Sequence, residues 1–77
     1  MTKQTLLEKA DILFGTINES SEPLSSLSLL DICLKWYTQI RKAALENKNT
    51  EEFFYCEEKI EKVAKLRNKI IYSLYNL

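Results

Sequence analysis

Apolar residues recur with helical spacing along the C-terminal third of the chain, over residues 53–77. The steps between them are mostly three or four, which is the period of one face of an α-helix. The positions are Phe53, Cys56, Ile60, Val63, Ile70, Leu74 and Leu77. Arg67 interrupts the series, and the final stretch IIYSLYNL carries no charged side chain. The pattern predicts one long helix over about residues 50–75 whose apolar face needs cover.

Residues 23–47 predict a second helix that is apolar around most of its circumference. Its polar residues fall on one narrow stripe: Ser28, Asp31, Lys35, Thr38, Lys42 and Glu46. A helix this widely apolar is covered on more than one side, so we expect it at the centre of the fold. Two starts fit the sequence: Ser21 caps a helix that begins near Pro23, or the helix begins near Ser26 and the proline stays in the loop.

Residues 5–17 predict a first, shorter helix. Thr5 and Glu8 match a capping box, which satisfies backbone donors that a helix start leaves unpaired. The apolar stripe of this helix consists of Leu6, Leu7, Ala10, Leu13, Phe14 and Ile17. Gly15 weakens the last turn by about 1 kcal/mol relative to alanine. The segment that follows, residues 18–26, has the composition of a loop.

A polar connector at residues 47–49 joins the second and third helices and favours an antiparallel pair. Either Asn49 with Glu52, or Thr50 alone, caps the third helix. One proline and one glycine in 77 residues are too few for the turns that strands need. We therefore predict an all-α fold in a single domain over residues 1–77. It is a short antiparallel three-helix bundle with a long hairpin of the second and third helices.

The predicted helix lengths leave part of this hairpin uncovered. The third helix is about 39 Å long and the first only about 20 Å, at 1.5 Å per residue. Monomers avoid large exposed apolar surfaces, so the uncovered half predicts an interface. The turn at 47–49 brings residues 70–77 against the start of the second helix, near Leu24–Leu30. We expect a partner at that end.

Charge and hydropathy limit the classes of partner. The chain has 11 basic and 11 acidic residues, without the excess of cations that nucleic acids or anionic membranes attract. No apolar run approaches the length of a membrane span, so we expect no membrane insertion. The N-terminal segment, with Glu8, Lys9 and Asp11 among its apolar residues, does not resemble a targeting signal. The expected location is the cytoplasm.

Cys33 and Cys56 both fall within helical apolar patterns, so we expect buried thiols. The hairpin separates them by about 10 Å along the helix axes. A disulfide tolerates about 7 Å between Cα atoms, so we predict no bridge within the chain.

The residue types required for catalysis are scarce. The chain has no histidine, which removes the usual general base and the commonest metal ligand. Two isolated cysteines do not form a structural zinc site, and there is no glycine-rich phosphate loop. The acidic cluster Glu51, Glu52, Glu57, Glu58 and Glu61 is assigned to the positive helix end and to a solvated face. Pairs such as Glu58 with Lys62 and Glu61 with Lys65 belong to that face. We predict no enzyme activity, no cofactor and no metal site.

The aromatic residues divide into two groups. We expect Phe53, Trp36 and Tyr37 in the core, and Phe54, Tyr55, Tyr72 and Tyr75 facing outward. Outward aromatic side chains are typical of interface anchors. Arg67 has two interpretations: an interface residue, or a residue at the core edge whose head reaches water while Leu66 takes the buried place. The candidate protein-binding residues are Leu27, Arg67, Ile71, Tyr72, Tyr75 and Leu77.

Residues 27–77 resemble the helical-hairpin co-chaperones of type III secretion needle subunits. The resemblance rests on QIRKAALENKN, residues 39–49, and on EEFFYCEEKIEKVAKLRNKIIYSLYNL, residues 51–77. In that family a two-helix hairpin joins a helical-repeat chaperone and holds the needle subunit unpolymerised in the bacterial cytoplasm. The resemblance implies that the apolar faces of the second and third helices contact such a chaperone. The predicted helix at 5–17 departs from the family pattern.

The sequence thus predicts a non-enzymatic protein–protein interaction module, in its most concrete form a secretion co-chaperone. The expected partner is another protein, helical in structure, or a second copy of the chain. Two alternatives remain open. One is an immunity-type helical bundle, and the other is a small homodimeric regulatory or phage protein that blocks a partner.

Overall fold

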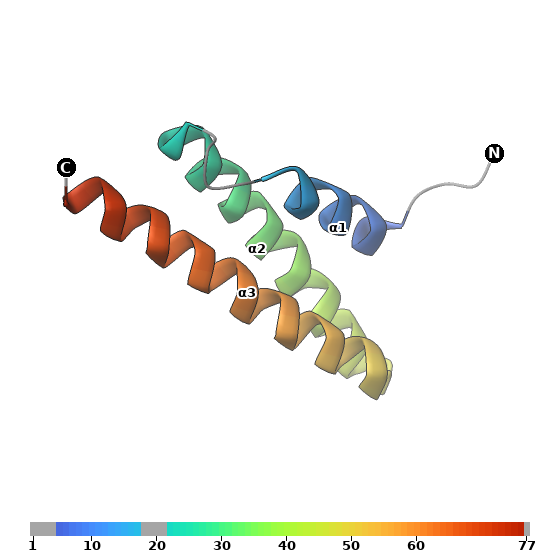
Figure 1. Cartoon of the computed structure of the whole chain (residues 1–77). Coiled ribbons are helices and arrows are strands. Elements are labelled where there is room, and N and C mark those ends of the chain that lie inside the picture. Colours follow the sequence, from blue (N-terminus) through green and yellow to red (C-terminus); the bar gives the residue numbers. More distant parts are fainter. Residues whose placement is uncertain (1–4, 18–21, 77) are drawn as a thin grey trace.

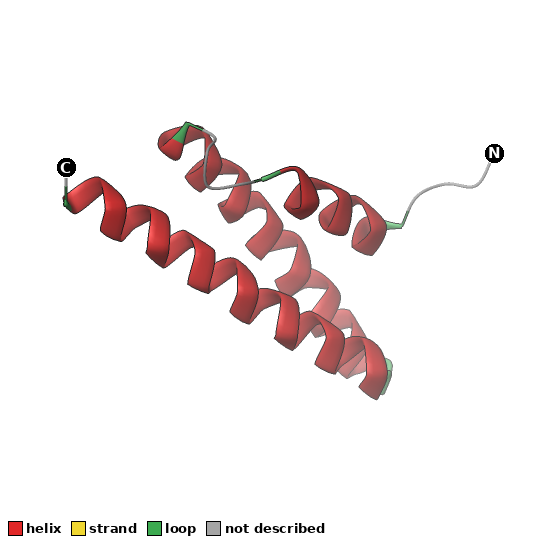
Figure 2. Cartoon of the chain, viewed as in Figure 1, coloured by secondary structure: helices red, strands yellow, loops and turns green. Residues whose placement is uncertain are grey.

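The computed structural model describes residues 5–17 and 22–76, which form three helices. Helix α1 spans Leu6–Thr16, α2 spans Pro23–Glu46 and α3 spans Thr50–Tyr75 (Figure 1). No strand occurs within the described ranges (Figure 2). Helices α2 and α3 lie side by side as a long antiparallel hairpin, and α1 packs mainly on α2. The predicted all-α three-helix bundle is confirmed.

Side-chain hydrogen bonds cap the starts of α1 and α3. The Thr5 hydroxyl accepts a bond of 3.1 Å from the Glu8 backbone N–H at the head of α1. The Asn49 side chain accepts a bond of 3.2 Å from the Glu52 backbone N–H at the head of α3, so the first of the two predicted caps is present. Helix α2 begins at Pro23, the earlier of its two predicted starts. Its predicted cap, Ser21, lies outside the described residues.

Three residues close the hairpin between α2 and α3. The backbone N–H of Asn49 donates to the carbonyl of Ala44 at 2.8 Å, and that of Lys48 donates to the carbonyl of Leu45 at 3.2 Å. These two bonds form a Schellman motif, which satisfies carbonyls that the end of a helix leaves unpaired. Lys48 takes the left-handed position of the motif, with φ of 57°. Glycine is usual there because it has no Cβ to crowd the backbone.

Two ion pairs show the register of the hairpin. Arg41 contacts Glu57 at 3.1 Å, and Arg67 contacts Asp31 at 2.9 Å. The α2 partners lie ten residues apart, and so do the α3 partners in the opposite direction, as an antiparallel pair requires. The same register brings residues 71–75 opposite residues 23–27, in agreement with the predicted meeting of these segments.

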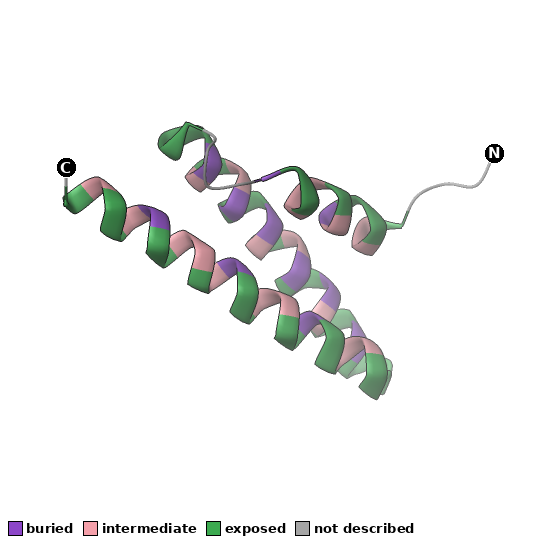
Figure 3. Ribbon diagram, viewed as in Figure 1, coloured by how far each residue is buried: buried purple, intermediate pink, exposed green. Residues whose placement is uncertain are grey.

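The core follows a heptad pattern (Figure 3). The buried residues of α2 are Ser26, Leu30, Cys33, Tyr37, Ile40 and Ala44. The buried residues of α3 are Cys56, Val63 and Ile70, seven residues apart. Alternating steps of four and three, or steps of seven, keep one helix face toward a neighbour in coiled-coil packing. Both cysteines are free and buried, as predicted.

Helix α1 places its apolar stripe on this core. Ala10 and Ile17 are buried, and Leu6, Leu7, Leu13 and Phe14 pack against the core cluster. Leu6 lies beside Ile40 and Ala44, near the hairpin turn. Figure 1 shows α1 beside the middle and turn half of α2, away from the C-terminal end of α3. Because α1 has 11 residues against 26 in α3, it covers only part of the hairpin.

Two of the three aromatic residues predicted in the core lie at its margin. Tyr37 is fully buried, as expected. Trp36 is half-buried and packs against the core from outside. Phe53 is half-buried and lies beside the turn, because α2 ends at Glu46 and offers no further surface to cover it.

We expect Lys48→Gly to stabilise the protein by about 0.5–1 kcal/mol. The left-handed conformation costs about 1–2 kcal/mol for a residue with a Cβ, and the greater freedom of glycine in the unfolded chain offsets part of the gain. Urea denaturation followed by circular dichroism measures the change. Lys48→Ala removes the same charge but keeps the Cβ, so it should give no gain. Equal stability of the two variants would contradict this account of the turn.

Candidate functional site

The start of α2 and the end of α3 form an apolar end of the hairpin, which we call the C-terminal tip. It comprises Leu24, Leu27, Ile71, Tyr72 and Tyr75. Leu24 is 66% exposed, Tyr72 is 72% exposed and Tyr75 is 85% exposed. Tyr72 and Tyr75 stand three residues apart and are therefore neighbours on the surface of α3. The hairpin register brings the start of α2 opposite this end of α3, so the tip comprises side chains from two helices.

The structure describes five of the six candidate residues, and they differ in exposure. Tyr72 and Tyr75 face solvent, as predicted, and Ile71 is half-buried. Leu27 is half-buried and packs against the core, so only part of it belongs to the surface. Leu77 lies outside the described residues.

Arg67 belongs to the hairpin itself. Its Nε donates a hydrogen bond of 2.9 Å to the Asp31 carboxylate on α2, and its side chain is 39% exposed. Leu66 packs against the core, which agrees with the interpretation that placed Arg67 at the core edge. The pairing with Asp31 was not predicted, because it depends on the register of two helices rather than on spacing along one.

A second apolar surface surrounds the hairpin turn, which we call the turn patch. Leu45 is 64% exposed and Phe54 is 62% exposed. They line a hollow of about 240 Å³ together with Ala44, Phe53 and the turn residues. The Phe53 and Phe54 rings meet edge to face, with centroids 5.5 Å apart. The sequence prediction placed Phe54 outward, as observed, but it missed this surface because it assigned Phe53 to the core.

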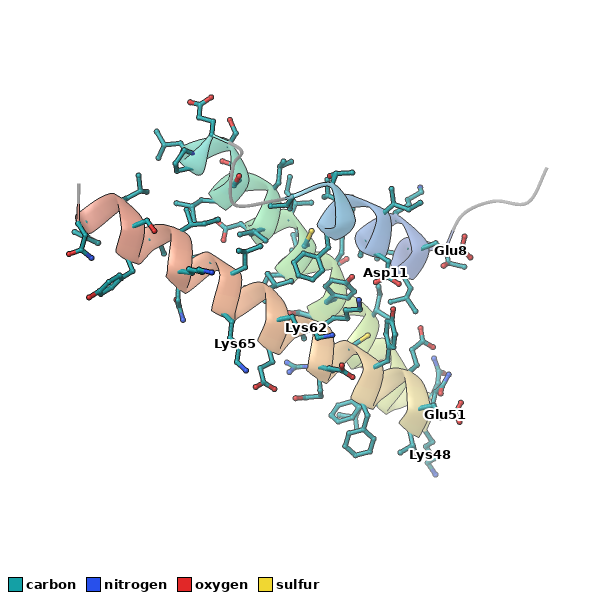
Figure 4. The ribbon with its side chains drawn as sticks, in the orientation of Figure 1. Glu8, Asp11, Lys48, Glu51, Lys62 and Lys65 are labelled. Atoms are coloured by element: carbon teal, nitrogen blue, oxygen red, sulfur yellow. The ribbon has the colours of Figure 1, made fainter. Side chains whose placement is uncertain are left out.

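A carboxylate joins all three helices, and we call this group the Asp11 latch. One oxygen of Asp11, on α1, accepts a hydrogen bond from the Tyr37 hydroxyl on α2. The other oxygen accepts a bond of 2.8 Å from the Tyr55 hydroxyl on α3. Figure 4 shows Asp11 on the side of α1 that faces the hairpin. The sequence did contain a signal: Asp11 stands four residues after Leu7 and three before Phe14, on the apolar face.

The tyrosine hydroxyls of the latch and the thiols of the core all have raised pKa values. Burial, followed by the bond to Asp11, raises the pKa of Tyr37 well above its ordinary value. The hydrogen bond to Asp11, followed by burial, raises the pKa of Tyr55 to about 12. Burial raises the pKa of the Cys33 thiol to about 11 and also raises the pKa of the Cys56 thiol. These hydroxyls and thiols are therefore neutral near pH 7, where the thiols are poor nucleophiles.

The charged residues of α3 form a solvated face. Glu58 contacts Lys62 and Glu61 contacts Lys65, each at 3.2 Å, as the four-residue spacing predicts. Lys59 lies over two aromatic rings, 5.8 Å from the centroid of Phe14 and 5.5 Å from that of Tyr55. A cation over an aromatic face is attracted to it, so Lys59 links α3 to the rim of α1.

Neither a metal site nor a membrane-spanning helix occurs among the described residues. Within residues 5–17 and 22–76, no three histidine, cysteine, aspartate or glutamate side chains gather as a metal ion would need. None of the helices in those ranges combines the length and apolar character needed to cross a bilayer. The chain matches no family model, and no curated protein or solved structure is significantly similar to it.

We expect Asp11→Ala to destabilise the protein by about 2 kcal/mol. Two hydroxyl groups lose their acceptor, and leaving a buried donor unpaired costs about 1–3 kcal/mol. Lys9→Ala is the matched control, because Lys9 is exposed on the same helix and should change stability by less than about 0.5 kcal/mol. Urea denaturation monitored by circular dichroism measures both. If the two variants lose the same stability, the latch contributes nothing.

We also expect stability to fall at alkaline pH. Folding raises the pKa of Cys33 from 9.0 to about 11 and that of Tyr55 from 10.0 to about 12. Above about pH 9 the unfolded chain therefore holds fewer protons than the folded chain, and the free energy of unfolding decreases as pH rises. This stability is fully present below about pH 9 and is lost progressively up to about pH 12.

Urea titrations between pH 7 and 11 follow this loss. Tyr37→Phe and Tyr55→Phe should each flatten the decline above about pH 10, because each removes a group that titrates. A free energy of unfolding that stays constant from pH 8 to 11 would show that neither the thiols nor the hydroxyls are coupled to folding.

Proposed function

We propose that the protein acts without catalysis by binding another protein through the C-terminal tip. The observation that carries the proposal is the exposure of Tyr72 and Tyr75, at 72% and 85%, at the end of the hairpin where Leu24 on α2 is also exposed. A tyrosine loses little side-chain freedom when it binds and offers a large apolar surface with a polar end. Exposed aromatic clusters of this kind are favoured anchors of protein interfaces.

The chemistry of the tip favours an apolar, helical partner surface. Residues 70–77 carry no charged side chain, so the tip does not depend on charge pairing for recognition. Side chains from α2 and α3 both contribute, which suits insertion into a groove between helices of the partner. The resemblance of residues 27–77 to secretion co-chaperones supports the same kind of partner, a helical-repeat chaperone, and a location in the bacterial cytoplasm.

The turn patch favours a second candidate, self-association. Leu45 and Phe54 lie at the opposite end of the hairpin and are both more than 60% exposed. An isologous contact uses the same patch on both copies, and an apolar patch is complementary to itself. A homodimeric regulatory protein would use this surface. Sedimentation of the purified chain separates this candidate from a monomer that binds a different protein.

To test the C-terminal tip, tagged variants of the protein are used to capture partner proteins from extracts of the native cell. Mass spectrometry then measures how much of each partner every variant retains. Tyr75→Asp and Ile71→Asp should each reduce the amount of the specific partner by at least about tenfold, the expected effect of losing an interface anchor. Ser73→Asp is a charge-matched control on another side of the same helix end, and Lys62→Ala is a control on the solvated face. All four should retain the helical circular dichroism of the parent.

Two results would contradict the proposal. Equal capture by Tyr75→Asp and Ser73→Asp would show that the partner does not contact the tip. A partner that is lost with Phe54→Asp but kept with Tyr75→Asp would assign the interface to the turn patch.

A further inference from the structure

Helix α1 covers part of the α2–α3 hairpin, and it is a weak helix. It has 11 residues, and isolated helices of this length are marginal in water. Gly15 lowers its helix propensity further. A Cβ at Gly15 would meet no atom within 4 Å, so packing does not require glycine there. The helix therefore depends on the hairpin for its structure.

The hairpin presents a defined set of contacts to whatever helix lies on it. Ala10 is fully buried, so a small residue is needed where the helix approaches most closely. The hydroxyl groups of Tyr37 and Tyr55, one from each hairpin helix, converge on a single carboxylate. Lys59 adds a cation at the rim of the same groove. Two donors and a nearby cation select an acidic group on the bound helix.

We propose that the groove beneath α1 is a helix-binding site, which α1 occupies in the free protein and which a helix of another protein takes in its place. The chemistry of α1 defines the partner. It is an amphipathic helix with a small residue at the position of Ala10, larger apolar residues around it, and a carboxylate at the position of Asp11.

The length of the groove gives the partner an advantage over α1. Helix α1 ends at Thr16, whereas the apolar face of α3 continues to Leu66, which is half-buried and packs against the core. A longer helix covers surface that α1 is too short to reach, and this additional burial offsets the high effective concentration of a tethered segment. The groove beneath α1 is separate from the C-terminal tip. An experiment can therefore disprove binding at one of these two sites without disproving binding at the other.

The first test uses the full chain with Ala10→Arg, which places a charge at a buried position and should displace α1. The probe is a labelled peptide with the sequence of residues 5–17. We expect the variant to bind it at least about tenfold more tightly than the parent chain, whose own α1 competes at an effective concentration of about millimolar. Trp36, the only tryptophan, lies beside Ile12 and Leu13, so its emission follows occupancy of the groove.

The peptide itself tests recognition of the carboxylate. The Asp11→Asn peptide should bind at least about fivefold more weakly than the unchanged peptide, because a neutral acceptor makes weaker hydrogen bonds. The Glu8→Gln peptide removes the same charge from the same helix and should bind like the parent. The difference in affinity between the Asp11→Asn peptide and the unchanged peptide should become smaller when the Ala10→Arg chain that binds them also carries Tyr55→Phe.

Hydrogen exchange of the unmodified chain keeps the proposal testable if Ala10→Arg fails to fold. Amides of α1 should exchange at least about tenfold faster than those around Cys33 and Val63, through an opening that leaves the hairpin intact. Equal protection of all three helices would overturn the proposal, because the groove would then not exist without α1. Equal binding of the Asp11→Asn and Glu8→Gln peptides would overturn the proposed recognition of a carboxylate.

Discussion

The buried hydroxyl of Tyr37 needs an acceptor, and the arrangement of the three helices depends on how that need is met. A turn motif and two ion pairs define the hairpin without α1. The contacts of the α1 stripe are largely apolar, and apolar burial has little directional preference. The Asp11 carboxylate adds direction, because it bonds to one tyrosine on each hairpin helix. A single acidic residue thus sets the position of α1 along the groove.

Helix α1 covers part of the hairpin, and the surface that remains exposed divides into apolar and charged areas. The C-terminal tip and the turn patch lie at opposite ends of the hairpin and expose large apolar side chains. Charged residues along α3 instead form pairs with their neighbours four positions away. Exposed ion pairs contribute little to stability, so their main effect is to keep this face solvated. Among the described residues, exposed apolar side chains gather at the two ends of the hairpin, and Ile12 on α1 and Ile32 on α2 are exposed between them.

Local spacing accounts for what the sequence could predict. The helix ranges, the Thr5 and Asn49 caps, the turn and the ion pairs of α3 all depend on residues within four positions of one another. The exposure of Tyr72 and Tyr75 followed from the same periodicity. The Asp11 latch, the pairing of Arg67 with Asp31 and the position of Phe53 could not be predicted in this way. Each depends on where one helix ends or how far it slides along another, which residues distant in sequence determine together.

The heptad spacing of the core has a consequence for how such a hairpin can change in length. Cys56, Val63 and Ile70 are separated by seven residues, and the buried positions of α2 repeat with the same period. Inserting seven residues into both helices would preserve the inward face and move the two apolar ends apart by about 10 Å. Inserting any number that is not a whole repeat would rotate one end relative to the other. The heptad repeat therefore sets both the distance between the two apolar ends of the hairpin and their relative orientation.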